Sequence, residues 1–328
     1  MLLHYRLSRH LAARCASAAF VTAILQFPAY FSSCTKTEDP AGKRTQIYIQ
    51  WSKNPTPEAL DLLFFETEGQ QKLDSYHQVS LEGGNSRLFG ISGKGPRQLV
   101  AISGKKGETA KWADIINYGS LSSKTFLLKD ENPYAPRLFA ETFIEDETSR
   151  ITSLPLSPML SCIVIRFISC DFRERPYHGK TFDNTAIYIT YAGSEFRPLG
   201  EERGPVSWIN GGELDSLACL SLPFPEMVLQ DGLGEIGPAG KSVPKTFYCY
   251  AGSTAVKPRL VLEGTVDGKT CYYPIEIEGL GPGGTVNLNI NIWRIGTQHP
   301  DIPIQGGMVT LETVALPWDI QDAYDVMF

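Results

Sequence analysis

The stretch Val286-Asn-Leu-Asn-Ile-Asn-Ile-Trp293 alternates strictly between apolar and polar residues. Successive side chains of a β-strand point to opposite faces, so this pattern predicts a strand with one buried face. An earlier run, Met159-Leu-Ser-Cys-Ile-Val-Ile-Arg-Phe-Ile-Ser-Cys170, is the most apolar of the chain and predicts a buried strand. Two such runs indicate a fold organised around β-sheets.

Shorter strands are predicted along most of the chain, each bounded by turns that contain Gly or Pro. They are expected at residues 47–51, 60–65, 88–91, 98–102, 120–129, 138–142, 185–191, 217–222, 246–250, 259–264, 271–277 and 308–316. One helix is expected at residues 109–118, where Trp112, Ile115 and Ile116 fall at helical spacing and Gly119 serves as a stop. This is an all-β pattern of the β-sandwich kind with one short helix in the N-terminal half.

The composition also suggests where the chain divides. The residue composition changes near residues 149–157, where Pro155 and Pro158 stand, as expected at a domain boundary. We expect a signal peptide at residues 1–33, a lipidated tether at 34–44, an N-terminal β-sandwich domain at 45–155, a C-terminal β-sandwich domain at 156–303, and a C-terminal strand and tail at 304–328.

The N-terminus has the order of a secretory signal peptide: a basic head with Arg6, Arg9 and Arg14, an apolar run, and small residues at its end. That end reads Phe31-Ser-Ser-Cys34, which is similar to a bacterial lipobox except that Phe replaces the usual Leu or Val. The pattern predicts a lipid on the thiol of Cys34. The alternative is an ordinary signal peptide with an unmodified cysteine at this position.

Charge narrows the class of partner. The chain has 30 Lys and Arg against 36 Asp and Glu, and the basic residues form no cluster, which argues against nucleic acid as a partner. No second apolar run approaches 20 residues, so the lipid would be the membrane attachment.

Five cysteines follow Cys34, and no two of them form a CxxC motif. They are Cys162, Cys170, Cys219, Cys249 and Cys271. Cys249 and Cys271 lie in neighbouring predicted strands and could pair, but buried free thiols are the favoured interpretation.

No motif for catalysis or metal binding is present. His77, His178 and His299 are far apart and each is expected in a polar loop, without the spacing of a zinc site. Neither a GxSxG motif nor a P-loop occurs. Trp51, Trp208 and Trp293 sit in or beside predicted strands, where core packing is the favoured role. We therefore expect a protein that is not an enzyme and that has neither metal nor cofactor.

The last predicted strand is separated from the body by a linker broken at Gly296, Pro300 and Pro303. Its apolar residues are Val309 and Leu311 on one face, then Val314, Leu316 and Trp318 after a change of phase at Thr313. Such a strand can pair with its own sheet or complete the sheet of another chain, because main-chain hydrogen bonds are the same in both cases.

The sequence resembles a known family in two regions. The order Cys34, tether, Ile47…Trp51, Pro57…Leu62-Leu-Phe-Phe-Glu66 is similar to the minor, anchor-type fimbrium subunits of Bacteroidales. The series Tyr272-Tyr-Pro-Ile…Gly281-Pro-Gly…Asn287-Leu-Asn-Ile…Arg294-Ile-Gly…Pro300-Asp-Ile-Pro…Trp318 resembles the C-terminal domain of the fimbrillin superfamily, the type V pilus subunits.

The resemblance implies two transthyretin-like β-sandwich domains in tandem and export as a lipoprotein, with palmitate among its acyl chains, to the surface of the outer membrane. It also implies assembly with other fimbrial subunits by strand donation, with Val309, Leu311, Val314, Leu316 and Trp318 filling the groove of the partner. A role in adhesion implies a receptor on a host or bacterial surface.

Stalk subunits of the family lose an N-terminal strand to an Arg-specific protease, and Arg44 is the matching site here. Only the polar tether precedes Arg44, so cleavage would remove no strand and open no groove. An anchor or accessory subunit fits this better than a stalk subunit. The alternative function is a surface glycan-binding lipoprotein of similar architecture, which would present aromatic side chains on one exposed face.

Overall fold

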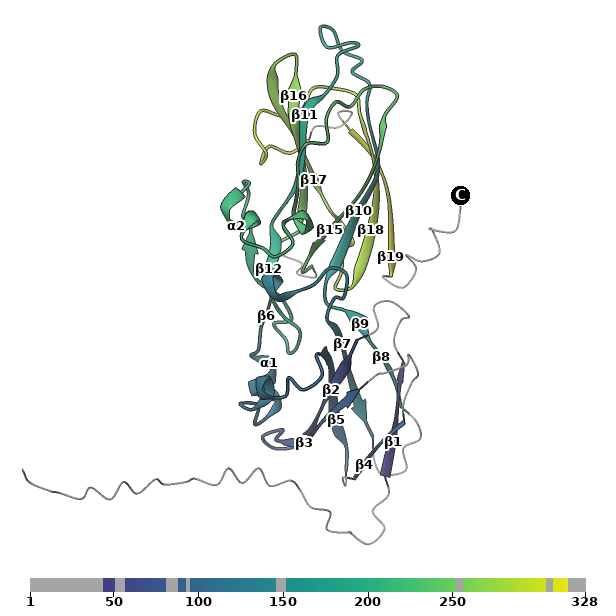
Figure 1. The fold of residues 1–328 in the computed structure, drawn as a ribbon, viewed down its shortest axis with the longest axis vertical. Helices are drawn as coiled ribbons and strands as arrows, with labels where there is room; N and C mark the ends of the chain where they lie inside the picture. The colour runs from purple at the N-terminus through teal and green to yellow at the C-terminus, as the bar shows by residue number, and fades with distance from the viewer. Residues whose placement is uncertain are drawn as a thin grey trace, which may run out of the picture. The chain divides into compact units, whose positions relative to one another are not determined.

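The structure is a computed structural model that describes residues 44–50, 57–80, 88–92, 95–145, 152–251, 256–304 and 309–317. In these residues β-strands dominate, and the helices are two short α-helices and three 3-10 turns (Figure 1). The expected all-β fold is therefore confirmed. None of the described helices is long and apolar enough to span a bilayer.

Two four-stranded sheets in the C-terminal half pack against a common hydrophobic core (Figure 1). The first has the order β15 (Lys241–Cys249), β10 (Ser161–Cys170), β18 (Gly284–Ile292) and β19 (Val309–Pro317). The second has the order β14 (Leu229–Gln230), β11 (Asp183–Thr190), β16 (Arg259–Val266) and β17 (Lys269–Glu276). β10 lies inside the first sheet, antiparallel to β15 and parallel to β18.

The two stretches that predicted this fold are the inner strands of the first sheet. In β18 the apolar positions are buried and the asparagines between them are partly exposed, as the alternation predicts. β10 is buried along most of its length because it has a strand on each side and a core against its face. Burial of each large apolar side chain contributes about 1.5–3 kcal/mol, so these two strands hold much of the core's stability.

A five-stranded sheet forms the centre of the N-terminal half, with both faces covered. Its order is β3 (Leu73–Ser80), β2 (Ala59–Glu66), β5 (Arg97–Gly104), β7 (Leu138–Ile144) and β9 (Ser157–Pro158). In β2, Leu62 and Phe64 belong to one core cluster, whereas Leu63 and Phe65 belong to the larger cluster shared with the C-terminal sheets. Burial on both faces explains why most residues of β2 are apolar, without alternation.

Two three-stranded sheets complete the fold. One has the order β4 (Leu88–Ser92), β1 (Arg44–Gln50) and β8 (Thr152–Pro155), and Leu154 of β8 joins the smaller core cluster. The other has the order β13 (Gly204–Ile209), β12 (Ala192–Arg197) and β6 (Phe126–Leu127), which pairs strands from distant parts of the sequence.

The helix predicted at residues 109–118 is wrong. That segment contains only the 3-10 turn η1 (Ala110–Trp112), and the helix α1 (Tyr118–Ser122) begins where the prediction ended. The backbones of residues 116 and 118 bond to Leu73 and Gln71, which holds this segment extended against β3. Tertiary pairing thus overrides the helical spacing of the apolar residues.

The strand predicted at residues 217–222 is also wrong, because it is the helix α2 (Ser216–Leu220). Asp215 caps it by accepting a hydrogen bond from the amide of Ala218. At residues 120–129 the expected strand is reduced to β6, between α1 and the 3-10 turn η2 (Leu128–Asp130). Three longer strands were missed, β3, β12 and β13, along with short ones, and another 3-10 turn, η3 (Pro225–Met227), precedes β14.

Candidate functional site

The C-terminal strand β19 lies at the edge of its sheet. In the described residues it pairs with β18 alone, antiparallel, along all nine of its residues. β18 in turn pairs on its other side with the buried strand β10. The most C-terminal described strand therefore pairs with one described strand, and that strand belongs to the core.

The register of β19 on β18 is continuous, without a bulge. Val309 and Leu311 stand opposite Ile292 and Ile290, whereas Val314 and Leu316 stand opposite Asn287 and Thr285. Because the backbone has no bulge at Thr313, the change of phase remains in the ladder. Val309 and Leu311 take one series of alternating positions, and Val314 and Leu316 take the other. Trp318, the fifth residue expected at a subunit interface, lies outside the described residues.

The linker between β18 and β19 crosses to the opposite sheet. The backbones of Thr297 and Tyr272 of β17 exchange two hydrogen bonds, both 2.9 Å long. The hydroxyl of Thr297 donates to the carbonyls of Tyr272 and His299, at 3.1 Å and 2.9 Å. Gly296 lies so close to β17 that an added Cβ would sit 2.5 Å from the carbonyl oxygen of Tyr272, so the chain requires glycine here.

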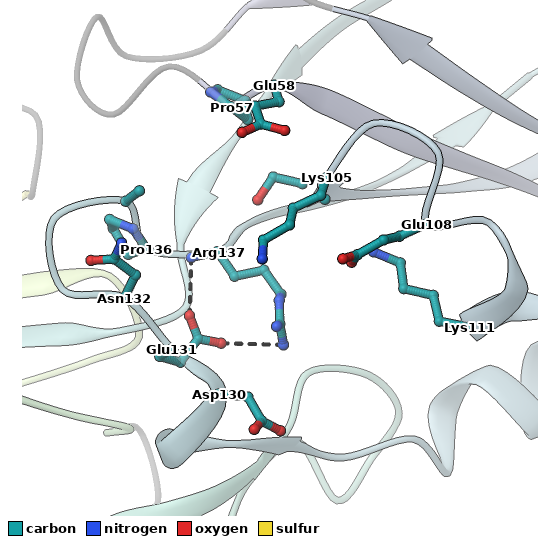
Figure 2. A pocket seen from close by; sticks show the side chains of 13 residues that line it. Pro57, Glu58, Lys105, Glu108, Lys111, Asp130, Glu131, Asn132, Pro136 and Arg137 are labelled. Atoms are coloured by element: carbon teal, nitrogen blue, oxygen red, sulfur yellow. Dashed lines mark hydrogen bonds and ion pairs between the residues drawn. The ribbon is translucent and has the colours of Figure 1, made fainter. Parts of the chain in front are cut away.

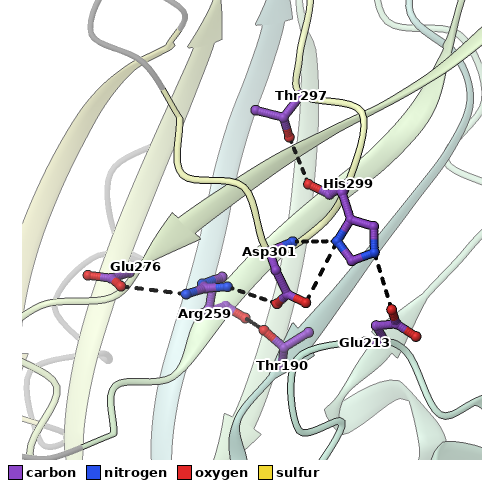
Figure 3. Close-up of polar contacts among 7 residues, drawn as sticks. All are labelled: Thr190, Glu213, Arg259, Glu276, Thr297, His299 and Asp301. Carbon is purple, nitrogen blue, oxygen red and sulfur yellow. Dashed lines mark hydrogen bonds and ion pairs between the residues drawn. The ribbon is translucent and has the colours of Figure 1, made fainter.

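Contacts between polar and charged side chains hold the next residues of the linker (Figure 3). Arg259 of β16, whose side chain is mostly buried, contacts Asp301 at 3.2 Å and Glu276 at 3.6 Å. His299 contacts Glu213, in the loop before α2, at 3.2 Å through Nε2. We call residues 296–301, together with Tyr272, Arg259 and Glu213, the linker clamp.

The three residues Glu213, His299 and Asp301 of the linker clamp lie close enough to suggest a metal site. Their arrangement favours a polar network instead. The amide of Asp301 donates to Nδ1 of His299 at 3.3 Å, and the Asp301 carboxylate is engaged by Arg259. A metal on Nδ1 of His299 would displace that amide, a metal on Asp301 would compete with Arg259, and all three side chains are exposed.

At the N-terminal end, Arg44 is the first residue of β1. β1 is the middle strand of its sheet, antiparallel to β4 and parallel to β8. The strand expected at residues 47–51 is therefore part of the body, and the candidate cleavage site stands at its beginning. Cys34, the candidate lipidation site, lies outside the described residues.

A polar pocket of about 310 Å³ opens where β2 begins, β5 ends and β7 begins (Figure 2). Its charged lining residues are Glu58, Lys105, Glu108, Lys111, Asp130, Glu131 and Arg137. Two buried carboxylates stand in or behind its wall, and each is paired: Asp61 with Lys111 at 2.9 Å, and Glu131 with Arg137 at 3.2 Å. Pairing of this kind gives each buried carboxylate an oppositely charged partner and serves the structure of the wall.

The sequence analysis predicted neither of the two polar sites, the linker clamp and the pocket. His299 and Asp301 were visible only as part of a Pro-rich linker, while Glu213 and Arg259 are distant in sequence. The pocket combines segments from residues 57 to 137. No local spacing marks either site, because each is made by strands that meet through the fold.

The described cysteines are buried free thiols, as favoured from the sequence. The alternative pair, Cys249 and Cys271, lies in β15 and β17, which belong to different sheets. Burial raises the pKa of Cys249 to about 12, and it also raises the pKa values of Cys170, Cys219 and Cys271. These thiols are held in the unreactive protonated form.

Two expectations for aromatic and histidine side chains need correction. Trp208 of β13 is exposed rather than part of the core, and Trp293 is half-buried beneath the guanidinium of Arg173. His77 lies in β3 and not in a loop. The exposed aromatic residues Tyr134, Phe143 and Trp208 belong to three different elements.

Neither a protein-family model nor a curated protein sequence matches this chain. Its fold does match solved structures. A proposed cell adhesion protein from Bacteroides eggerthii superposes with a TM-score of 0.61 at 16% identity, over 84% of this chain and 97% of the other. A fimbrilin from Porphyromonas gingivalis superposes with a TM-score of 0.57 at 13% identity, over 84% and 98%.

A second proposed cell adhesion protein, from Parabacteroides distasonis, superposes with a TM-score of 0.59 at 11% identity, over 84% of this chain and 98% of that one. The chain therefore has a Bacteroidales fimbrillin-type fold, as the resemblance implied. These three solved structures are described as cell adhesion and fimbrial proteins.

Proposed function

We propose that this chain is a structural, non-catalytic subunit of a cell-surface fimbrium that assembles by donating β19 to another subunit. The observation that carries the proposal is the position of β19 at the sheet edge, paired with β18 alone. A neighbouring chain can offer the same nine-residue ladder, so exchange between subunits conserves the main-chain hydrogen bonds. The shared fold with a fimbrilin supports the same role.

The position of β1 supports an anchor or accessory role. Cleavage after Arg44 would leave Thr45–Gln50 in place between β4 and β8, so the sheet would keep its middle strand and no acceptor groove would form. A subunit that donates a strand but opens no groove of this kind ends a polymer. A lipid on Cys34 would fix that end to the outer membrane, with the fimbrium serving adhesion to a receptor on a host or bacterial surface.

Strand donation is tested with a reversible disulfide between β18 and β19. Asn289 and Glu312 are directly opposite in the ladder, at a spacing that a disulfide accepts. In the variant Asn289→Cys with Glu312→Cys we expect the oxidised protein to remain out of fimbriae and the reduced protein to enter them. Because the oxidised and reduced proteins have the same sequence, any misfolding caused by the substitutions would affect both states. Equal incorporation in both states would refute strand donation.

The anchor is tested separately by Cys34→Ser. We expect the variant to move from the detergent phase to the aqueous phase in a Triton X-114 partition of the exported protein. Unchanged partitioning would show that the membrane attachment does not depend on this thiol.

The glycan-binding alternative predicted aromatic side chains gathered on one exposed face. Among the described residues, the exposed aromatic side chains are Tyr134 on the loop before β7, Phe143 on β7 and Trp208 on β13. The fold shared with a fimbrilin favours the fimbrial role.

A further inference from the structure

We propose that the linker clamp stays closed when β19 leaves β18, so that the donated segment begins only after Asp301. This inference rests on the proposed function and specifies which part of the chain moves. It makes Arg259, Tyr272 and Thr297 positioning residues for assembly, since they would fix the point from which the strand departs.

The linker and β19 differ in their backbone pairing and contacts. Among the described strands, β19 pairs by a ladder with β18 alone. Residues 293–301 are held by several elements: β17 through Thr297, β16 through Asp301, and the loop before α2 through His299. Segments with one neighbour at a sheet edge open locally at a lower free energy than segments tied to several elements.

The start of the linker is fastened as well. The hydroxyl of Tyr273 donates to the carbonyl of Arg294 at 2.8 Å, and Arg294 contacts Glu174 at 3.1 Å. The amide of Arg173 donates to the carbonyl of Trp293 at 3.0 Å, while its guanidinium covers the Trp293 ring at 4.2 Å. Release of the linker would break all of these contacts at once, together with those of the clamp.

The clamp also determines how far β19 can extend from the body of the subunit. If the chain were free from Ile292 onward, about 17 residues would lead to Val309, and an extended chain would span roughly 58 Å. With the clamp closed, only the residues after Asp301 are available, and they span roughly 27 Å. The clamp therefore shortens the tether by more than half.

A shorter tether has two consequences for assembly. It raises the effective concentration of β19 near an acceptor that lies within its span, and it excludes acceptors farther away. It also limits the directions in which the next subunit can lie. The clamp would thus help to set the geometry of the joint between subunits, as well as its formation.

The test compares two reversible locks in the full-length chain. The clamp lock is Tyr272→Cys with Thr297→Cys, two residues that face each other in an antiparallel bridge. The strand lock is Asn289→Cys with Glu312→Cys, described above. Each variant is produced in cells, its disulfide is confirmed by gel shift, and its content in sheared, sedimented fimbriae is measured under oxidising and reducing conditions.

We expect the clamp lock to change incorporation by less than twofold between the oxidised and reduced states, while the oxidised strand lock lowers it at least tenfold. Incorporation of the clamp variant that falls tenfold on oxidation and returns on reduction would overturn the clamp inference and leave strand donation standing. If the strand lock has no effect, strand donation itself fails, and the clamp inference fails with it.

Discussion

The buried carboxylate of Glu131 joins the loop before β7 to Tyr250, the residue that directly follows β15, and its removal offers a quantitative test of the fold. Its side chain is 1% exposed. It accepts hydrogen bonds from the hydroxyl of Tyr250 at 2.8 Å and from the amide of Arg137 at 3.1 Å, and it pairs with the Arg137 guanidinium. We take the substitution Glu131→Ala as the perturbation.

The expected loss in the free energy of unfolding follows from the groups that the substitution leaves without a partner. The Tyr250 hydroxyl is fully buried, and an unsatisfied buried donor costs about 1–3 kcal/mol. Breaking a buried ion pair by removing one partner costs about 3–5 kcal/mol, toward the lower value here because Arg137 is partly exposed and can regain water. The two costs together are about 4–6 kcal/mol. At roughly 2 °C per kcal/mol for a chain of this size, we expect Tm to fall by about 8–12 °C.

The assay is thermal unfolding of a double-mutant cycle. Tyr250→Phe removes the hydroxyl but keeps the ring that stacks on Phe196 at 5.1 Å between centroids. In that background Glu131→Ala should cost about 1–3 kcal/mol less, because no hydroxyl is left unpaired. A fall in Tm below about 2 °C for Glu131→Ala, or equal costs in the two backgrounds, would refute this account of the buried network.

Three further predictions follow from the structure. The thiols of Cys162, Cys170, Cys219, Cys249 and Cys271 should be unreactive toward DTNB in the folded protein and react fully in 6 M guanidinium, because all five are buried; rapid labelling of the native state would contradict their placement. Burial lowers the pKa of His77, opposed by nearby Asp74, so the unfolded state binds the proton more readily and stability should fall as the pH drops from about 7 through 6.5 toward the lowered pKa. His77→Gln should flatten that slope in urea titrations at pH 5 and 7, whereas an unchanged slope would exclude His77 as its source. Gly296→Ala should speed hydrogen exchange of the Thr297 and Tyr272 amides at least tenfold, because its Cβ would clash with the Tyr272 carbonyl, whereas Gly281→Ala, which has open space around it, should leave these amides unchanged; equal behaviour of the two variants would count against the close contact.

Much of the fold was readable from local pattern. The alternation in β18 and the apolar run of β10 predicted their strands because two-residue periodicity and burial act over a few neighbouring residues. The errors occurred where distant backbone contacts override that pattern. Residues 116–118 pair with residues 71–73 instead of forming a helix, and the segment at 217–222 is helical with a cap from Asp215.

The sequence by itself determined the all-β class, the position of the last strand and the polar character of the residues before Arg44, since each depends on residues adjacent in the chain. Only the tertiary structure decided that β19 pairs with a single described strand, that β1 stands between two strands, and that Arg259 and Glu213 contact the linker. Those features arise from contacts between residues far apart in sequence, whose pairing depends on how the sheets are ordered and not on any local spacing.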